Sequence, residues 1–274
     1  MSPIIATLCT NNSYQDLKLF LKSLSLCYSK ADAPTIYLYT DSETMASVIA
    51  DGYFLYIVFN TCLDLYSGLT RQDMEAVRRP TKTLWYEFQM EKLNLLDWVF
   101  QSEPDCTEGV FYLDSDICFF GPLPPIPSTA TVALSPHYIR KHDESRFGRY
   151  NGGFLWMRHS QAVQTWRAAC PTSRFHEQAA LECFDGAEWK GKVHTFPQQV
   201  NYGWWRMFQG SVSPLELQAK WTSSPTGIMV DGVPLQSVHT HFYKPSERAC
   251  QIFNDFVISK MPEAHPLVKA IKFE

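Results

Sequence analysis

The feature of this sequence that most constrains its fold is a short apolar run that ends in two acidic residues. Val110 to Leu113 is apolar throughout, and Asp114, Ser115 and Asp116 follow it directly. A run without polar alternation is typical of a strand buried on both faces, as in the centre of a parallel sheet. Open α/β sheets bind ligands at the carboxyl ends of such strands. We therefore predict a central strand that delivers two carboxylates to a ligand site.

The rest of the chain fits an α/β fold built around that strand. Short apolar runs alternate with segments in which apolar residues recur at helical spacing. Strands are predicted at residues 4–9, 35–39, 55–59 and 154–157, and helices at residues 13–28 and 83–99. This alternation predicts a mixed, mainly parallel central sheet flanked by helices. Because no repeat, low-complexity tract or linker interrupts the sequence, we predict a single domain over residues 1–274.

Composition and missing motifs exclude several classes of protein. The formal net charge is −4 with acidic and basic residues mixed along the chain, so no nucleic-acid partner is predicted. The eight cysteines are scattered without a CxxC pair, which favours reduced thiols and a cytoplasmic location. No signal peptide is recognisable and no run reaches the roughly 18 apolar residues of a membrane span. The glycine-rich motifs of dinucleotide-binding oxidoreductases and P-loop NTPases are also absent.

The acidic pair is the strongest candidate for a metal site. In an extended chain, Asp114 and Asp116 lie two residues apart and point to the same face. Their hard oxygen ligands suit Mg²⁺ or Mn²⁺, which in turn bridges the oxygens of a pyrophosphate. The alternative is that one aspartate caps a turn and the other is solvated.

Two histidines near the C-terminus are candidates for a further metal ligand. His239 and His241 flank Thr240 in an apolar segment, so they face the same side if that segment is extended. The alternative is a pair of surface histidines at the end of a strand. Lys244 follows soon after and could offer a positive charge to a leaving diphosphate, although a solvated lysine is the ordinary case.

The order of these motifs resembles that of the GT-A glycosyltransferases, and of glycosyltransferase family 8 in particular, over most of the chain. The resemblance implies a single Rossmann-like GT-A domain, with a nucleotide-binding half at about residues 1–117 and an acceptor-binding half at about residues 118–274. The sequence departs from the family at Asn11 and Glu177, where an aspartate is typical. It also lacks the family's glycine and tryptophan around Lys244 and Pro245.

The resemblance further implies a donor site for a nucleotide-sugar, with a UDP-linked sugar favoured. The tyrosine at Tyr14 would stack on uracil, and Lys92 would lie near the donor. The metal would be Mn²⁺ or Mg²⁺, with His241 favoured over His239 because the aromatic residue, lysine and proline after it resemble the family's spacing. The implied donor-binding residues are Thr10, Asn11, Asn12, Tyr14, Asp41, Lys92, Asp114, Ser115, Gly152, Gly153 and Lys244.

The same resemblance implies that catalysis depends on Asn151, Glu177 and Gln178. Glu177 could act as a general base on an acceptor hydroxyl, as an inverting enzyme needs. Gln178 cannot take a proton, so a position against the reacting carbon would favour retention of configuration. Gly152 and Gly153 would let the backbone approach a sugar closely, whereas the alternative is a tight turn before a strand.

The acceptor is expected to be a glycan or another hydroxyl compound. We predict that it meets an irregular polar loop from His137 to Arg149 and the aromatic segment from Tyr202 to Trp205. The alternative for these aromatic rings is packing in the core.

Two other functions remain open for the acidic pair. A phosphotransferase with a nucleophilic aspartate uses the same motif, but there it ordinarily follows the first strand, with Thr or Val at the position of Cys118. A non-catalytic protein that binds nucleotide-sugars or carbohydrates is the second alternative. A glycoside hydrolase is disfavoured, because two carboxylates two residues apart do not span a glycosidic bond.

Overall fold

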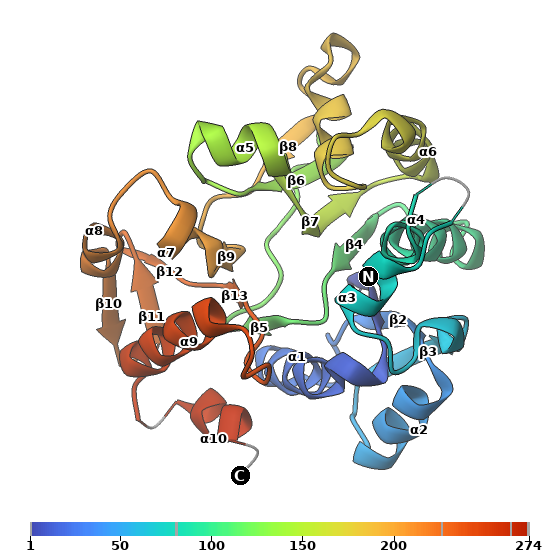
Figure 1. Ribbon diagram of the computed structural model, residues 1–274. Coiled ribbons are helices and arrows are strands. Elements are labelled where there is room, and N and C mark those ends of the chain that lie inside the picture. Colours follow the sequence, from blue (N-terminus) through green and yellow to red (C-terminus); the bar gives the residue numbers. More distant parts are fainter. Residues whose placement is uncertain (1, 80–81, 226, 264, 273–274) are drawn as a thin grey trace.

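The computed structural model describes residues 2–79, 82–225, 227–263 and 265–272. Its centre is a seven-stranded sheet in the order β3-β2-β1-β4-β7-β6-β8 (Figure 1). Only β7 runs antiparallel to its neighbours β4 and β6, which confirms a mixed, mainly parallel sheet. The strands are β1 (Ile4–Cys9), β2 (Thr35–Thr40), β3 (Tyr56–Asn60), β4 (Val110–Leu113), β6 (Val132–Pro136), β7 (Tyr150–Met157) and β8 (Val193–Thr195).

Helices cover both faces of this sheet, because its strands bury side chains on both sides. Successive residues of a strand point to opposite faces, so Ile5 packs with α1 (Tyr14–Cys27) and α2 (Ser42–Asp51). Figure 1 shows these two helices beside the β1–β3 part of the sheet. Ala6 packs on the other side with α4 (Leu84–Ser102) and α6 (Ser160–Ala169). The short helix α3 (Arg71–Ala76) packs on α4.

A smaller sheet pairs a strand from the C-terminal part of the chain with two strands from earlier in the sequence. Strand β5 (Ile117–Phe119) pairs antiparallel with β13 (Ser237–His239), and β13 pairs in parallel with β9 (Tyr202–Gly203). This register sets Ile117 opposite His239. The backbone ladder therefore brings the residue after Asp116 next to a histidine more than a hundred residues away in sequence.

A third core lies behind the small sheet, in the C-terminal part of the chain. It packs Trp221, Val238 and Phe253 between a second small sheet and α9 (Arg248–Lys260). The strands of that sheet are β10 (Trp221–Ser224), β11 (Gly227–Val230) and β12 (Val233–Pro234). The remaining helices are α5 (Lys141–Phe147), α7 (Trp205–Gln209), α8 (Pro214–Ala219) and α10 (Pro266–Lys272), with short 3-10 helices at Asn11–Ser13, Asp64–Tyr66, Cys170–Thr172, Ala179–Asp185 and Ala187–Trp189.

Two predicted segments differ from the structure. The strand predicted at residues 154–157 begins earlier, at Tyr150, so Gly152 and Gly153 lie inside β7 rather than in a turn before it. Pairing with β4 on one side and β6 on the other explains this, since two neighbours can hold glycines extended. The loop predicted from His137 to Arg149 contains the helix α5, and Arg140 before it pairs with Asp143 in its first turn.

The cysteines and helices bear on two other expectations. All eight cysteines are unpaired, in agreement with the reduced thiols predicted from the sequence. Within the described part of the chain, no helix combines the length and apolar character needed to cross a membrane.

Candidate active site

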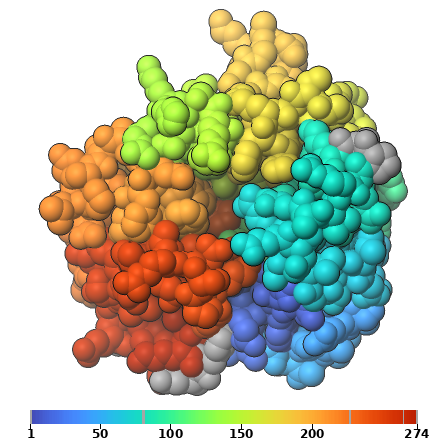
Figure 2. Space-filling model, viewed as in Figure 1, coloured from blue at the N-terminus to red at the C-terminus, as the bar shows by residue number. Residues whose placement is uncertain are grey.

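A cleft of about 790 Å³ opens where β1 and β4 end. Figure 2 shows a hollow on this face, between the cyan segment that carries α3 and the orange-red segment near α9. The end of β1, the residues after β4, the helices α3 and α4 and the segment from His241 to Glu247 supply its walls. The cleft thus lies at the carboxyl ends of the central strands, where ligands of open α/β sheets bind.

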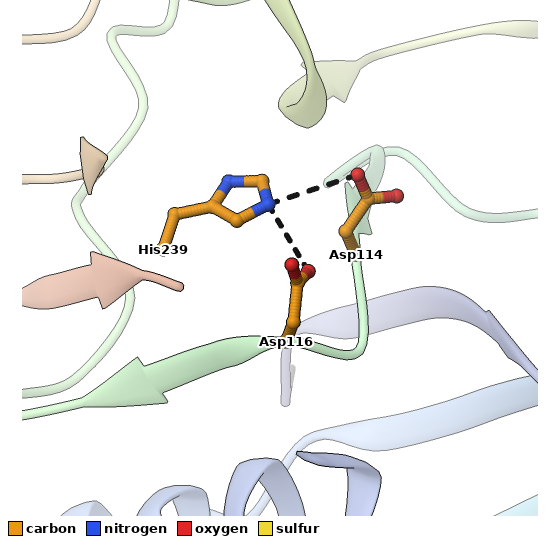
Figure 3. Close-up of side chains that lie close together, drawn as sticks. All are labelled: Asp114, Asp116 and His239. Carbon is orange, nitrogen blue, oxygen red and sulfur yellow. Dashed lines mark ion pairs between the residues drawn. The ribbon is translucent and has the colours of Figure 1, made fainter. Parts of the chain in front are cut away.

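Two carboxylates that line this cleft meet an imidazole behind them. Asp114 directly follows β4, Asp116 precedes β5, and His239 ends β13. The Nε2 atom of His239 lies 3.1 Å from Asp116 Oδ1 and 3.8 Å from Asp114 Oδ2 (Figure 3). Among the described residues these three offer ligand atoms within 4.8 Å of one another. Two carboxylate oxygens and one imidazole nitrogen are a donor set that fits a divalent cation.

The surroundings of this cluster leave no spare room. Gly153 on β7 lies so close that a Cβ atom there would overlap Asp114 Oδ2 and stand 2.6 Å from His239 Cε1. The Trp205 ring packs edge-on against the His239 ring, with centroids 5.1 Å apart. The three side chains are therefore held in a cradle that a methyl group would fill.

Replacement of Gly153 by Ala is expected to reduce Mn²⁺ affinity at least about tenfold, because the added methyl group displaces Asp114 and His239. Calorimetric titration with MnCl₂ measures this. Gly121→Ala is the matched control, since the nearest atom to a Cβ there is 4.0 Å away. Equal affinities of both variants for Mn²⁺ would show that the cradle is not needed for binding.

His241 approaches Asp116 from the side of the cleft. Its Nε2 atom lies 3.4 Å from Asp116 Oδ2, and its Nδ1 atom lies 2.9 Å from Asp16 Oδ2. Burial would lower the pKa of His241, but Asp116 and Asp16 raise it above its ordinary value. Burial would likewise raise the pKa of Asp116, but His239 and His241 lower it well below its ordinary value. The structure brings both histidines to Asp116, and only His239 belongs to the tighter group of three.

Lys92 on α4 connects the acidic pair to Glu177. Its buried ammonium lies 2.9 Å from Glu177 Oε1 and 3.3 Å from Asp114 Oδ1. The hydroxyl of Tyr112 donates to the same Asp114 oxygen at 2.8 Å. Burial would lower the pKa of Lys92, but Asp114 and Glu177 raise it above its ordinary value, so the ammonium stays charged.

A smaller chamber of about 170 Å³ continues from the cleft past Lys92 and Asp114. Gln178 lines it, and the side-chain amide of this residue is fixed at both ends. It accepts the Gly152 N–H at 3.2 Å and donates to the Phe147 carbonyl at 2.9 Å. This chamber therefore combines a fixed amide with the carboxylate of Glu177 next to the candidate cation site.

Asn151 lies in β7, and its side chain binds the backbone of the same strand. It is buried and does not line the cleft, and its Oδ1 atom accepts hydrogen bonds from Gly153 N–H and Asn201 Nδ2, each at 3.1 Å. His137 packs beside it and donates from Nδ1 to the Gly148 carbonyl at 2.9 Å. Burial lowers the pKa of His137 to about 4, so this ring is neutral near pH 7. These contacts suit a role in holding the site rather than in touching substrate.

The predicted nucleotide-binding residues divide into two groups. Thr10, Asn12, Ser115 and Lys244 line the cleft. Asn11, Tyr14 and Asp41 do not. The backbone N–H of Asn11 donates to Asp41 at 2.8 Å, and Asp41 also caps α2 by accepting the Thr44 N–H at 2.7 Å. These hydrogen bonds stabilise the turn after β1 on the side that faces away from the cleft.

Tyr14 lies away from the cleft, and its hydroxyl donates to Asp51 on α2 at 2.6 Å. Tyr14→Phe is therefore expected to leave UDP affinity unchanged and to lower stability by about 1 kcal/mol, the usual contribution of one hydrogen bond. Calorimetric titration with UDP and urea unfolding measure the two quantities. Phenylalanine keeps the ring, so Tyr14→Ala tests the stacking role that the sequence predicts, and a clear loss of UDP affinity in that variant would restore this role.

Sequence reasoning missed the aromatic wall of the cleft. Trp85 and Phe88 on α4 stack with ring centroids 5.6 Å apart, and the Arg71 guanidinium lies 5.2 Å above the Trp85 ring. All three line the cleft. The signal was present as two aromatic residues at helical spacing, but that pattern equally describes a helix face in the core.

The aromatic segment predicted to meet the acceptor mainly packs inside the protein. Tyr202 is buried against Trp221, and Trp205 is buried between His239 and His137, whose carbonyl accepts its Nε1–H at 3.1 Å. Trp204 is half-buried and its ring lies 6.2 Å from that of the exposed Phe208. Of the segment, Trp204 alone keeps a partly free ring.

The sequence matches no protein-family model and shows no significant similarity to a curated protein. Its fold is similar to the glycosyltransferase GlyE of Streptococcus pneumoniae TIGR4, with a TM-score of 0.57 at 12% identity over 100% of this chain and 63% of that one. The bifunctional glycosyltransferase WbbM gives 0.55 at 9% identity, over 99% and 51%. This chain thus spans less than two thirds of both proteins.

The galactosyltransferase LgtC, solved with donor and acceptor sugar analogs, matches over nearly its full length. The TM-score is 0.51 at 14% identity, and the match covers 97% of this chain and 99% of that one. The fold shared with these proteins is the GT-A fold of the glycosyltransferases, as the motifs of the sequence predicted.

Proposed function

We propose that this protein is a metal-dependent glycosyltransferase that moves a sugar from a nucleotide-sugar, by preference UDP-linked, to a hydroxyl group of a glycan or another acceptor. One observation carries the proposal. Asp114 of the carboxylate–imidazole cluster lines both cavities, one of about 790 Å³ and one of about 170 Å³, and Asp116 lines the larger one. The larger volume falls within the roughly 300–1,000 Å³ of small-molecule sites. In this assignment the larger cavity takes the nucleotide and the smaller one takes the sugar.

The residues of the cluster fit a divalent cation, Mn²⁺ or Mg²⁺, held by Asp114, Asp116 and His239. When bound, such a cation neutralises negative charge on a leaving diphosphate. Lys244 lines the same cleft and adds a positive charge near the phosphates. Thr10 and Asn12 offer hydroxyl and amide groups to the nucleotide from the turn after β1.

The contacts of Glu177 and Gln178 favour retention of configuration over inversion. Glu177 is buried and paired with Lys92, so it is a poor general base for an acceptor hydroxyl. Gln178 keeps its amide in the chamber and cannot take a proton. In a retaining transfer the bond from the sugar carbon to the diphosphate oxygen breaks, the acceptor oxygen bonds to the same face, and its proton passes to the leaving phosphate.

The decisive experiment is a thermal-shift screen of UDP-, GDP- and deoxythymidine-linked sugars with and without Mn²⁺. A donor near 100 times its Kd adds about 2.7 kcal/mol, which raises Tm by roughly 5 °C for a chain of this size. The donor so identified is then incubated with candidate acceptors, and release of nucleoside diphosphate is measured. Binding without release would favour the non-catalytic alternative, and release of inorganic phosphate would favour the phosphotransferase. A screen without any Mn²⁺-dependent shift would contradict the proposal.

Gln178→Ala is expected to lower kcat by about 10²-fold, the scale of losing one fixed dipole in a polar active site, with a much smaller change in donor KM. The reason is that its amide faces the chamber rather than the nucleotide cleft. Gln72→Ala is the matched control, because Gln72 lines the cleft but not the chamber. A rise in KM with unchanged kcat would limit Gln178 to donor binding.

A further inference from the structure

A buried carboxylate on α1 contacts the segment from His241 to Tyr243, beside the cation site. Asp16 is the third residue of α1 and is 3% exposed. Its Oδ2 atom accepts from His241 Nδ1 at 2.9 Å, and its Oδ1 atom accepts the backbone N–H groups of Phe242 at 3.0 Å and Tyr243 at 3.4 Å. The two oxygens thus have separate tasks, one toward an imidazole and one toward the backbone.

His241 carries this contact on to Asp116. With Nδ1 on Asp16, its Nε2 atom lies 3.4 Å from Asp116 Oδ2, while the other oxygen of Asp116 lies 3.1 Å from His239. Histidines that bind metals almost always donate their second ring N–H to a carboxylate or carbonyl, which fixes the tautomer and the ring. Asp16 supplies such an acceptor for His241.

His239 lacks the corresponding partner. Its Nδ1 atom is buried and forms no hydrogen bond among the described residues. His241 also lines the cleft, whereas His239 does not. His241 lies outside the group whose ligand atoms are all within 4.8 Å, so it approaches the site from the Asp116 side. Each histidine therefore has one of the two features expected of a ligand. His239 lies close to both carboxylates, and His241 has a hydrogen-bond acceptor for its second ring nitrogen.

We propose that Asp16 is a positioning residue of the cation site, and that it holds His241 so that its Nε2 atom joins Asp114, Asp116 and His239 as a fourth donor. A set with two imidazole nitrogens prefers Mn²⁺ or Co²⁺ to Mg²⁺, because imidazole suits transition metals and Mg²⁺ prefers oxygen. This inference rests on the cation site of the proposed function. It adds a residue that never touches the cation.

Asp16→Asn distinguishes the positioning of His241 from the hydrogen bonds that Asp16 makes to the backbone of Phe242 and Tyr243. Asparagine keeps a carbonyl oxygen for the Phe242 and Tyr243 amides and puts an NH₂ group where His241 Nδ1 now donates. The ring would then have to turn or change tautomer. We expect Mn²⁺ and Co²⁺ affinities of the free protein to fall about 10- to 100-fold, with a smaller change for Mg²⁺.

The measurements are calorimetric titrations with MnCl₂, CoCl₂ and MgCl₂ and the visible absorption spectrum of bound Co²⁺, all without nucleotide-sugar. Asp51→Asn is the matched control, because Asp51, like Asp16, accepts three hydrogen bonds, in its case from the side chains of Tyr14, Lys18 and Tyr53. If Asp16 acts through His241, the Asp16→Asn/His241→Ala double variant binds Mn²⁺ no more weakly than His241→Ala alone.

The outcomes distinguish this inference from the proposed function. Unchanged Mn²⁺ affinity and an unchanged Co²⁺ spectrum in Asp16→Asn overturn the inference, while the proposed function stands if the wild type binds Mn²⁺ and releases nucleoside diphosphate. A wild type that binds no divalent cation overturns both. If Asp16→Asn does not fold, His241→Ala decides, since loss of Mn²⁺ affinity supports the fourth donor and unchanged affinity overturns it.

Discussion

Replacement of Asp116 by Asn is expected to abolish Mn²⁺-dependent nucleotide binding and to lower transfer about 10³-fold. Asp116 contacts both histidines of the site, because one of its oxygens faces His239 and the other faces His241. Asparagine removes the negative charge and puts a donor where one of these oxygens stands. A cation that neutralises a leaving group contributes several kcal/mol, and each 1.36 kcal/mol is a factor of ten in rate, which gives the estimate of about 10³.

The measurement for Asp116→Asn is calorimetric titration of UDP with and without Mn²⁺, together with the rate of nucleoside diphosphate release. Asp97→Asn serves as the control, since Asp97 pairs with Arg167 on the surface away from the cleft. UDP affinity that stays equally dependent on Mn²⁺ in the Asp116 variant would contradict the assignment of this carboxylate as a ligand.

Lys92→Met is expected to destabilise the protein by about 3–5 kcal/mol, the usual result of removing one partner from a buried ion pair. Glu177 is 2% exposed and would lose its cation, and Asp114 would lose a charge neighbour at 3.3 Å. Urea unfolding measures the change in the free energy of unfolding. The double variant Lys92→Met/Glu177→Gln should recover part of the loss, because it no longer leaves Glu177 charged and buried.

An exposed pair gives the control for Lys92. Lys220 lies 3.7 Å from Asp231 with both side chains well exposed, so Lys220→Met should change stability by less than about 1 kcal/mol. If Lys92→Met falls in that same small range, water must reach Glu177, and the assignment of Lys92 and Glu177 as a buried ion pair would be wrong.

The fold was largely predictable because its main signals are local. The apolar run of β4 and the acidic pair after it can be read from seven consecutive residues, and the structure confirms the strand and the mainly parallel sheet. The start of β7 was not predictable in this way. Gly152 and Gly153 usually break structure, and only the two neighbouring strands hold them extended.

The candidate site was predictable for residues that directly follow a strand. It was not predictable for residues whose position depends on contacts with residues far away in sequence. Asp114, Asp116 and both histidines were named from the sequence, which favoured His241, whereas the structure groups His239 with the two aspartates. The position of Tyr14 depends on Asp51, which lies on another helix. The contact of Asp16 with His241 joins residues 225 positions apart, so no local pattern could indicate it. The roles of these residues in binding and catalysis stay predictions.

The short ladder between β5 and β13 has a consequence for how such proteins can diverge. Three residue pairs across the two strands set the spacing between the acidic pair and His239. Exposed turns of the long connection between the two strands can therefore accept insertions without moving the cluster, whereas Gly153 and Trp205, which also lie on this connection, pack against it. A single residue gained or lost within the ladder itself would turn His239 to the opposite face, since side chains alternate along a strand.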